Sequence, residues 1–144
     1  MPNRIIRNMV ENQTIIRASA QTTVAEAASQ MKQACVGTVM VIERDQLVGI
    51  FTERDALFGV LAEGRDAKTT RLAEVMTINP QTIKPDKPFG HALHMMYEGG
   101  FRHLPVVENG WPIGMVSARD TLVPEMQEFA HQLFHHEHIA EILA

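Results

Sequence analysis

Two nine-residue stretches of this chain, 49–57 and 114–122, have almost the same sequence. GIFTERDAL and GMVSARDTL each contain a glycine, two apolar residues, a hydroxyl residue, an arginine followed by an aspartate, and a final leucine. The same offset aligns the flanking residues without a gap, as in the pair Met31 and Met96. An internal repeat constrains the architecture strongly, and two copies are too few for a solenoid. We therefore expect two matching halves that bury their apolar faces against each other about a pseudo-twofold axis.

Both halves show the same order of expected elements. Helical spacing of apolar residues and runs of β-branched residues predict, in the first half, a helix over 22–34, strands at 38–42 and 47–51, and a helix over 53–64. The corresponding elements of the second half are a helix over 89–98, strands at 103–107 and 112–116, and a helix from 118. Thr23 and Glu26 form a capping-box pattern at the first helix, and Asn109-Gly110 is a typical hairpin turn. Each half is expected to be a β-α-β-β-α unit, so the fold class is α/β (α+β).

The composition of this 144-residue chain argues against several classes of protein. The 17 acidic and 13 basic residues give a net charge of −4, which does not favour a nucleic-acid partner. No apolar run approaches the length of a membrane span or a signal peptide. We therefore expect a cytoplasmic protein with neither nucleic acid nor membrane as a partner. The one cysteine, Cys35, excludes an internal disulfide and is expected to be a small buried apolar residue.

The repeated hydroxyl and carboxylate have one interpretation that needs no ligand. Thr52 and Asp55 follow a predicted strand and open a predicted helix, and Ser117 and Asp120 do the same in the second copy. A hydroxyl residue with an acid three residues later is a capping box, which satisfies the free amides at the start of a helix.

The second interpretation is a nucleotide site that occurs twice. A turn from a strand into a helix presents free backbone N–H groups, which favour a phosphate. A carboxylate at such a turn can accept hydrogen bonds from ribose hydroxyls, and Arg54 and Arg119 supply the cation that a polyphosphate needs. Helix capping does not require the arginine, although it could also be a solvated surface charge. The recurrence of the arginine favours the nucleotide site.

These motifs resemble the tandem cystathionine-β-synthase (CBS) domain pair, or Bateman module, of stand-alone bacterial-type CBS-domain proteins. The stretches VMVIERDQLVGIFTERD, EVMTINPQTI and RHLPVVENGWPIGMVSARD carry the resemblance, which covers about residues 8–125. It implies a first CBS domain at 8–66 and a second at 73–125, and leaves a C-terminal amphipathic helix at 126–144. The first copy departs from the pattern because it has Met40 where the second has Pro105, and because it lacks the Arg-His pair of 102–103.

The resemblance implies a regulatory module that binds adenosine-containing nucleotides (AMP, ADP, ATP or NAD) without catalysis, in two clefts between the repeats. Cleft one would be formed by Thr52, Asp55, Pro80, Gln81, Phe101, Arg102, His103 and Arg119. Cleft two would be formed by Ser117, Asp120, Ile15, Ile16, Val36, Gly37, Thr38 and Arg54. Because cleft one has the additional arginine Arg102, it is expected to bind phosphate more tightly. The nucleotide would be a regulatory ligand, and no cofactor is expected.

Two other classes of function are compatible with a chain of this length. An enzyme is not favoured, because the sequence shows no nucleophile-base pair, complete metal-ligand set or glycine-rich phosphate loop. A purely structural dimerisation module, in which the motifs are only helix caps, stays open as the alternative. A homodimer is expected in either case, because the apolar stripe over 126–134 needs a partner surface. A regulated partner protein is a further expected partner.

The end of the chain is rich in histidine, which is a common metal ligand. His131, His135 and His138 share one helical face, and imidazoles four residues apart can chelate zinc or nickel. The alternative is a solvated polar face or a dimer contact. Since no complete ligand set accompanies these histidines, no metal site is expected.

Overall fold

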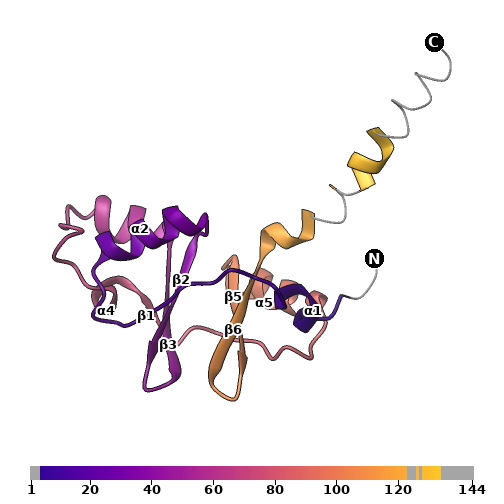
Figure 1. Ribbon diagram of the computed structural model, residues 1–144, viewed down its shortest axis with the longest axis horizontal. Helices are drawn as coiled ribbons and strands as arrows, with labels where there is room; N and C mark the ends of the chain where they lie inside the picture. Colours follow the sequence, from indigo (N-terminus) through magenta and orange to yellow (C-terminus); the bar gives the residue numbers. More distant parts are fainter. Residues whose placement is uncertain (1–3, 123–125, 127, 134–144) are drawn as a thin grey trace, which may run out of the picture.

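The computed structural model describes residues 4–122, 126 and 128–133, and shows two halves that lie side by side (Figure 1). The first half contains α1 (Ile6–Val10), β1 (Arg17–Ala18), α2 (Val24–Ala34), β2 (Thr38–Glu43), β3 (Gln46–Thr52), α3 (Glu53–Asp55) and η1 (Ala56–Leu61). The second half contains α4 (Leu72–Val75), β4 (Thr77–Ile78), α5 (Phe89–Gly99), β5 (His103–Glu108), β6 (Trp111–Ser117) and η2 (Ala118–Thr121). The mixed α/β fold and its duplication are therefore confirmed. Within the described residues, no helix has the length and apolar character needed to cross a membrane.

The strands form two groups, and β4, which follows the first repeat in the sequence, pairs with the strands of the first half. Four strands pair in the order β1-β2-β3-β4, with β1 parallel to β2 and the other pairs antiparallel. In the second half β5 pairs with β6, and Ile83 makes a parallel bridge to Val106 where the first half has β1 beside β2. Both hairpins turn through two residues of positive φ, which in the second is the predicted Asn109-Gly110 turn. The hairpins of the two repeats are therefore built alike.

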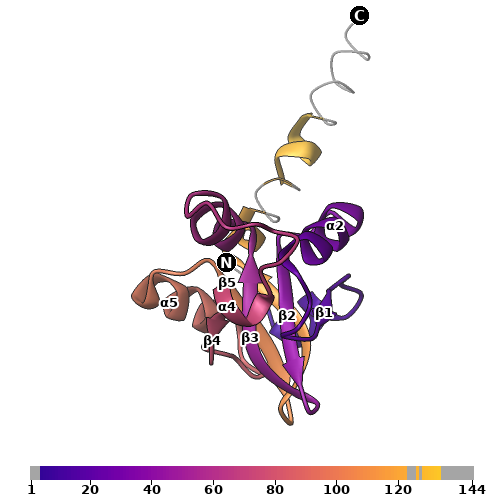
Figure 2. The same ribbon diagram turned by 90° about the vertical axis from the view of Figure 1, so that its left-hand side faces the viewer.

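The two halves have separate cores and meet through their strands. Helices α2 and α5 lie on opposite sides of the molecule, with the strands between them, in both ribbon views (Figures 1 and 2). A third buried cluster contains Met40 and Ile50 from the first half and Met115 from the second. This apolar contact joins the two strand groups, as expected for halves that bury their apolar faces against each other.

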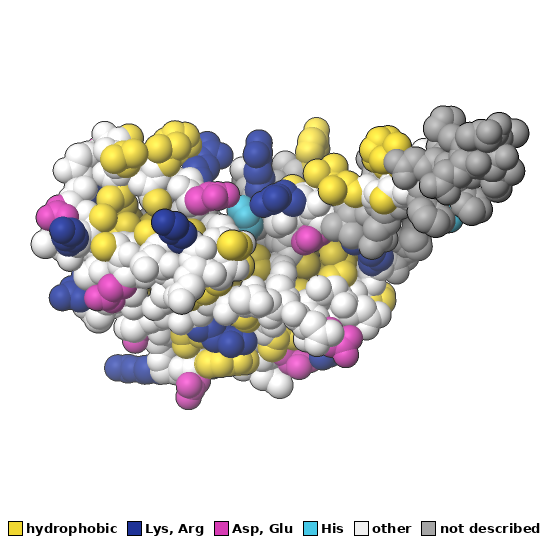
Figure 3. Space-filling model, turned by 45° about the horizontal axis from the view of Figure 1, so that its top comes forward, with side chains coloured by type: hydrophobic (Ala, Val, Ile, Leu, Met, Phe, Trp, Pro, Cys, Tyr) yellow, Lys and Arg dark blue, Asp and Glu magenta, His cyan; other side chains and the backbone are white. Residues whose placement is uncertain are grey.

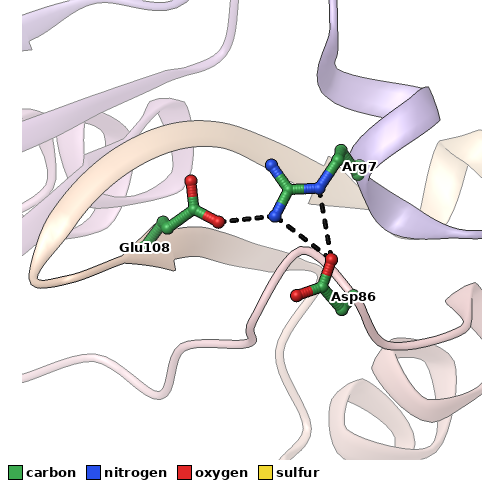
Figure 4. Close-up of polar contacts among 3 residues, drawn as sticks. All are labelled: Arg7, Asp86 and Glu108. Carbon is green, nitrogen blue, oxygen red and sulfur yellow. Dashed lines mark hydrogen bonds and ion pairs between the residues drawn. The ribbon is translucent and has the colours of Figure 1, made fainter.

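The short helix in front of each repeat packs against the other repeat. Ile6 and Val10 of α1 are buried in the core of the second half, whereas Leu72 of α4 is buried in the core of the first. Arg7 of α1 contacts two carboxylates of the second half, Asp86 and Glu108 (Figure 4). Three other side chains of the N-terminal segment form hydrogen bonds with the second half. Arg4 donates to the Asp120 carbonyl at 2.8 Å, and Arg17 donates to the Pro112 carbonyl at 2.8 Å. The Gln13 side chain donates to the Met115 carbonyl at 2.6 Å and accepts from the Met115 amide at 2.7 Å. The repeats are thus interlocked by an exchange of their leading segments.

The helices that follow β3 and β6 differ from the sequence prediction. The expected regular helix over 53–64 is one α-helical turn, α3, followed by the π-helix η1, in which the amide of Ala62 donates to the Leu57 carbonyl. The expected helix from 118 starts as the 3₁₀ turn η2. Residues 126 and 128–133 of the predicted C-terminal helix are helical, and its other residues lie outside the described part.

Two predictions about α2 have different outcomes. The hydroxyl of Thr23 accepts a hydrogen bond from the Glu26 amide at 3.2 Å, which is the forward half of the predicted capping box. The prediction that Cys35 is buried is wrong, because this residue is exposed. Cys35 ends α2 in the left-handed conformation, with φ 55°, and its amide donates to the carbonyls of the last helical turn, so this position serves as the helix C-cap and not as part of the apolar face of α2.

Candidate functional site

Two cavities of similar size lie where the repeats meet, with volumes of about 480 Å³ for cavity 1 and about 450 Å³ for cavity 2. Cavity 1 is lined by Ile50, Thr52, Glu53, Arg54, Asp55, Thr77, Asn79, Pro80, Gln81, Gly100, Phe101, Arg102 and His103. Cavity 2 is lined by Gln13, Thr14, Ile15, Ile16, Cys35, Val36, Gly37, Thr38, Met40, Glu53, His103, Met115, Ser117, Arg119, Asp120, Leu122 and Met126. Both volumes are in the range of small-molecule sites.

The hydroxyl and aspartate of each repeat form a helix cap at the edge of a cavity. The Asp55 carboxylate accepts from the Thr52 amide at 2.9 Å, and the Thr52 hydroxyl accepts from the Asp55 amide at 3.2 Å. In the second repeat the Ser117 amide donates to Asp120 Oδ2 at 2.8 Å, which is the equivalent of the Thr52 amide to Asp55 bond. The capping-box interpretation is therefore confirmed.

Capping leaves part of each aspartate for a ligand. In both caps the acceptor is Oδ2, and within the described part of the chain Oδ1 of Asp55 and of Asp120 accepts no hydrogen bond. A second oxygen on each carboxylate is therefore available for a donor such as a ribose hydroxyl. The two interpretations of the motif are compatible in this geometry.

The structure places the two motif arginines in the opposite cavities from those expected. The resemblance predicts Arg119 in the cleft of Thr52 and Arg54 in the cleft of Ser117. Arg54 instead lines cavity 1 and Arg119 lines cavity 2. This part of the prediction is wrong, because hydroxyl, arginine and aspartate share one short turn that keeps all three at the same cavity.

The remaining expected residues lie in the expected groups. Cavity 1 brings together Thr52, Asp55, Pro80, Gln81, Phe101, Arg102 and His103, and cavity 2 brings together Ser117, Asp120, Ile15, Ile16, Val36, Gly37 and Thr38. Sequence reasoning missed Glu53, which lines both cavities, as well as Asn79 and Gln13. Glu53 could have been noticed, because it stands inside the repeated motif where the other copy has Ala118.

The arginines of the cavities are not neutralised by protein carboxylates. Arg54, Arg102 and Arg119 form no ion pair with any residue that the structure describes. The guanidinium carbon of Arg54 lies 5.2 Å from the centre of the Phe58 ring, which holds the side chain without removing its charge. Figure 3 shows acidic, basic and histidine side chains gathered in the middle of one face. These cations are available to an anionic ligand.

His103 stands between the two cavities and lines both of them. It is the first residue of β5, paired with Ser117 of β6. Burial lowers the pKa of His103 below its ordinary value, and this exceeds the opposite effect of the negative charges of Glu53 and Asp120. The imidazole is therefore neutral at pH 7 and can act as both a hydrogen-bond donor and an acceptor.

The described residues contain no group of three His, Cys, Asp or Glu side chains that could hold a metal ion. Of the three histidines considered for metal binding, His131 is exposed, and His135 and His138 lie outside the described residues.

The sequence matches the CBS domain family twice, over residues 7–61 and 72–122. The "CBS domain-containing protein CBSX3, mitochondrial" of Arabidopsis thaliana is 34% identical over 116 residues, which cover 77% of this chain and 56% of that protein. The "CBS domain-containing protein YhcV" of Bacillus subtilis is 34% identical over 112 residues, which cover 78% of this chain and 79% of that protein. The chain thus spans about half of the Arabidopsis relative.

Solved structures share the fold. A CBS-domain protein from Burkholderia ambifaria is 29% identical with a TM-score of 0.75, over 84% of this chain and 92% of that one. The CBS domain protein PAE2072 from Pyrobaculum aerophilum, complexed with AMP, is 24% identical with a TM-score of 0.72, over 81% and 89%. The CBS domain pair of protein MJ0100, in complex with 5′-methylthioadenosine and S-adenosyl-L-methionine, is 22% identical with a TM-score of 0.77, over 88% and 99%.

Proposed function

The chain belongs to the CBS-domain family, and from this premise we propose that it is a regulatory module that binds adenosine-containing nucleotides without converting them. The ligands are AMP, ADP, ATP or NAD, or another compound built on adenosine. Binding takes place in the two cavities between the repeats, and the bound state is what a regulated partner would sense.

The observation that carries the proposal is the doubled grouping of one hydroxyl, one arginine and one aspartate at a cavity edge. Each aspartate has an oxygen left over from capping, and each arginine has no protein counter-charge among the described residues. A carboxylate suits ribose hydroxyls, and an arginine beside helix-start amides suits phosphate. Capping alone explains the hydroxyl and the carboxylate but not the unpaired cation.

Two structural neighbours are consistent with this class of ligand. The neighbour from Pyrobaculum aerophilum is complexed with AMP, and the neighbour MJ0100 with 5′-methylthioadenosine and S-adenosyl-L-methionine. All three compounds contain adenosine. Both neighbours are less than 25% identical to this chain and show the fold alone, whereas the residues that line the cavities support the class of ligand.

The second candidate is a dimerisation module without a ligand, which exposed apolar side chains on η1 favour. Leu57, Phe58 and Leu61 are 50%, 54% and 72% exposed. Apolar residues clustered on one surface helix commonly mark an interface with another protein chain. We propose that this surface pairs with a second copy, in the nucleotide-binding module as well as in a module without a ligand.

Thermal unfolding and calorimetry with AMP, ADP, ATP, NAD and adenosine test the proposal, with GMP as the control for the base. A ligand at a hundred times its dissociation constant stabilises the native state by about 2.7 kcal/mol. For a chain of this size that corresponds to a rise of roughly 5–11 °C in the midpoint. Chromatography of the nucleotide after incubation tests for conversion.

The results separate the candidates. A shift of the midpoint with adenine compounds, unchanged nucleotide and no shift with GMP supports the binding module. If the protein dimerises and none of the adenine compounds shifts the unfolding midpoint, the result supports the structural module. Conversion of a nucleotide would contradict the proposed absence of catalysis.

A further inference from the structure

One pair of matched positions gives the two repeats opposite charges. The Glu53 amide donates to the Gly37 carbonyl at 3.0 Å, and the Ala118 amide donates to the Arg102 carbonyl at 2.9 Å, so these pairs are equivalent in the two repeats. The first repeat therefore has an acid and no cation at this junction, whereas the second has a cation and no acid. The fold is duplicated here, but its electrostatics are not.

The acid of the first repeat is directed toward cavity 2. Gly37 lines cavity 2, and a Cβ added to Gly37 would lie 3.1 Å from Glu53 Oε1. The carboxylate therefore lies over Gly37, in the space that a longer side chain would fill. The absence of a side chain at position 37 thus allows the negative charge of Glu53 to reach this cavity.

The charges that line the two cavities differ as a result. In cavity 1 the carboxylates of Glu53 and Asp55 face two arginines, Arg54 and Arg102. Among the described residues of cavity 2, the carboxylates of Glu53 and Asp120 face one arginine, Arg119. None of these lining charges is engaged in an ion pair within the described part. A group bound in so small a cavity lies within roughly one Debye length, about 8 Å, of every lining charge, so salt screens these charges only in part.

We propose that cavity 2 takes an adenosine compound without phosphate groups, either neutral or positively charged, and that Glu53 is the residue that excludes phosphate. Asp120 still offers an oxygen to the ribose, so recognition of the nucleoside is retained. Cavity 1, with its second arginine, takes the phosphorylated nucleotide. The two cavities then sense two classes of adenosine compound. This inference rests on the proposed function, because it presupposes that adenosine compounds bind between the repeats.

The methyl group of Met115, which lines cavity 2, reports binding there in the unmodified protein. Its NMR signal, assigned with Met115→Leu, is followed while adenosine or AMP is added, and calorimetry measures total binding of each compound. We expect adenosine to shift the Met115 signal at a concentration about tenfold lower than AMP does.

The variants are Glu53→Ala, which gives the first repeat the residue that the second has, and Glu53→Gln. Each variant is expected to raise the affinity of cavity 2 for AMP about tenfold and to change its affinity for adenosine by less than about twofold. Glu63→Gln removes the same charge from an exposed residue that lines neither cavity, and should change neither affinity.

The inference is overturned if AMP shifts Met115 in the wild-type protein as readily as adenosine, or if both Glu53 variants keep the wild-type ratio. It is also overturned if calorimetry detects binding while neither compound shifts Met115, although the proposed function then survives. If calorimetry detects no binding of either compound, the proposed function fails and this inference fails with it.

Discussion

Gly114 lies so close to Val10 that a Cβ on Gly114 would overlap the Cβ of the valine. The equivalent Gly49 is similarly confined, because its Cβ would lie 2.5 Å from Met76 Sδ and 2.9 Å from the Thr77 carbonyl oxygen. In each case the neighbour belongs to the segment that leads into the other repeat. The glycine that begins both copies of the motif thus makes room for the exchanged leading segment, while the hydroxyl, arginine and aspartate of the motif line a cavity.

Gly114→Ala is therefore expected to destabilise the protein. Overpacking a filled core costs about 1–3 kcal/mol, because α1 has to move away from β6. Urea unfolding measures the loss. The control is Gly90→Ala in α5, where an added Cβ meets no atom within 4 Å. This control should not destabilise the protein, because alanine has a higher helix propensity than glycine. Equal stability of Gly114→Ala and the wild type would contradict the close packing of α1.

Features set by neighbouring residues were predictable from the sequence. The cap of Thr52 and Asp55 depends on residues three apart, and the Asn109-Gly110 turn depends on two residues that accept positive φ. Both are fixed by local backbone geometry, so a pattern in the sequence is enough to predict them.

Features set by contacts distant in the sequence were not predictable. The packing of α1 on the second half depends on the space beside Gly114, more than a hundred residues further along the chain. Glu53 lines both cavities because Gly37, in the loop between α2 and β2, leaves room for its carboxylate. These outcomes require the assembled fold.

The apolar surface of η1 is expected to hold the homodimer together. Leu61→Asp places a charge on a side chain that is 72% exposed in the single chain and would be desolvated in the dimer. Sedimentation equilibrium should then give the 16.1 kDa mass of one chain, whereas the wild type gives twice that mass. Ile78→Asp on β4, where the side chain is 64% exposed, is the control and should leave the dimer intact. A wild-type mass of one chain at micromolar concentration would refute the dimer.

The two cavities are expected to differ in affinity for phosphorylated ligands. Arg102→Gln removes one of the two arginines of cavity 1. This variant should lower the affinity for AMP about tenfold and the affinity for ATP more, and should leave the affinity for adenosine almost unchanged. Lys68→Gln, outside both cavities, is the charge control. Asp55→Ala should abolish the tighter of two binding events in calorimetry with AMP, and Asp120→Ala only a weaker one. Loss of the tighter event in Asp120→Ala alone would reverse this assignment.

The protein is expected to lose stability in mild acid through His103. Burial lowers the pKa of His103 in the folded state below its ordinary value of about 6.5, which is retained in the unfolded chain. At a pH between these two values the unfolded chain binds a proton that the folded protein does not. The contribution of His103 to stability is therefore complete above about pH 6.5 and is lost as the pH falls through the folded-state pKa.

Urea unfolding at about pH 7.5 and about pH 5.5 measures this effect, since the range spans the ordinary titration of histidine. The free energy of unfolding should fall more for the wild type than for His103→Gln, which keeps a polar side chain but cannot take up the proton. His91→Gln is the matched control, because His91 is an exposed residue of α5 that lines neither cavity. It should show the wild-type dependence on pH. If His103→Gln and His91→Gln lose equal stability over this range, burial of His103 between the cavities does not control the acid response.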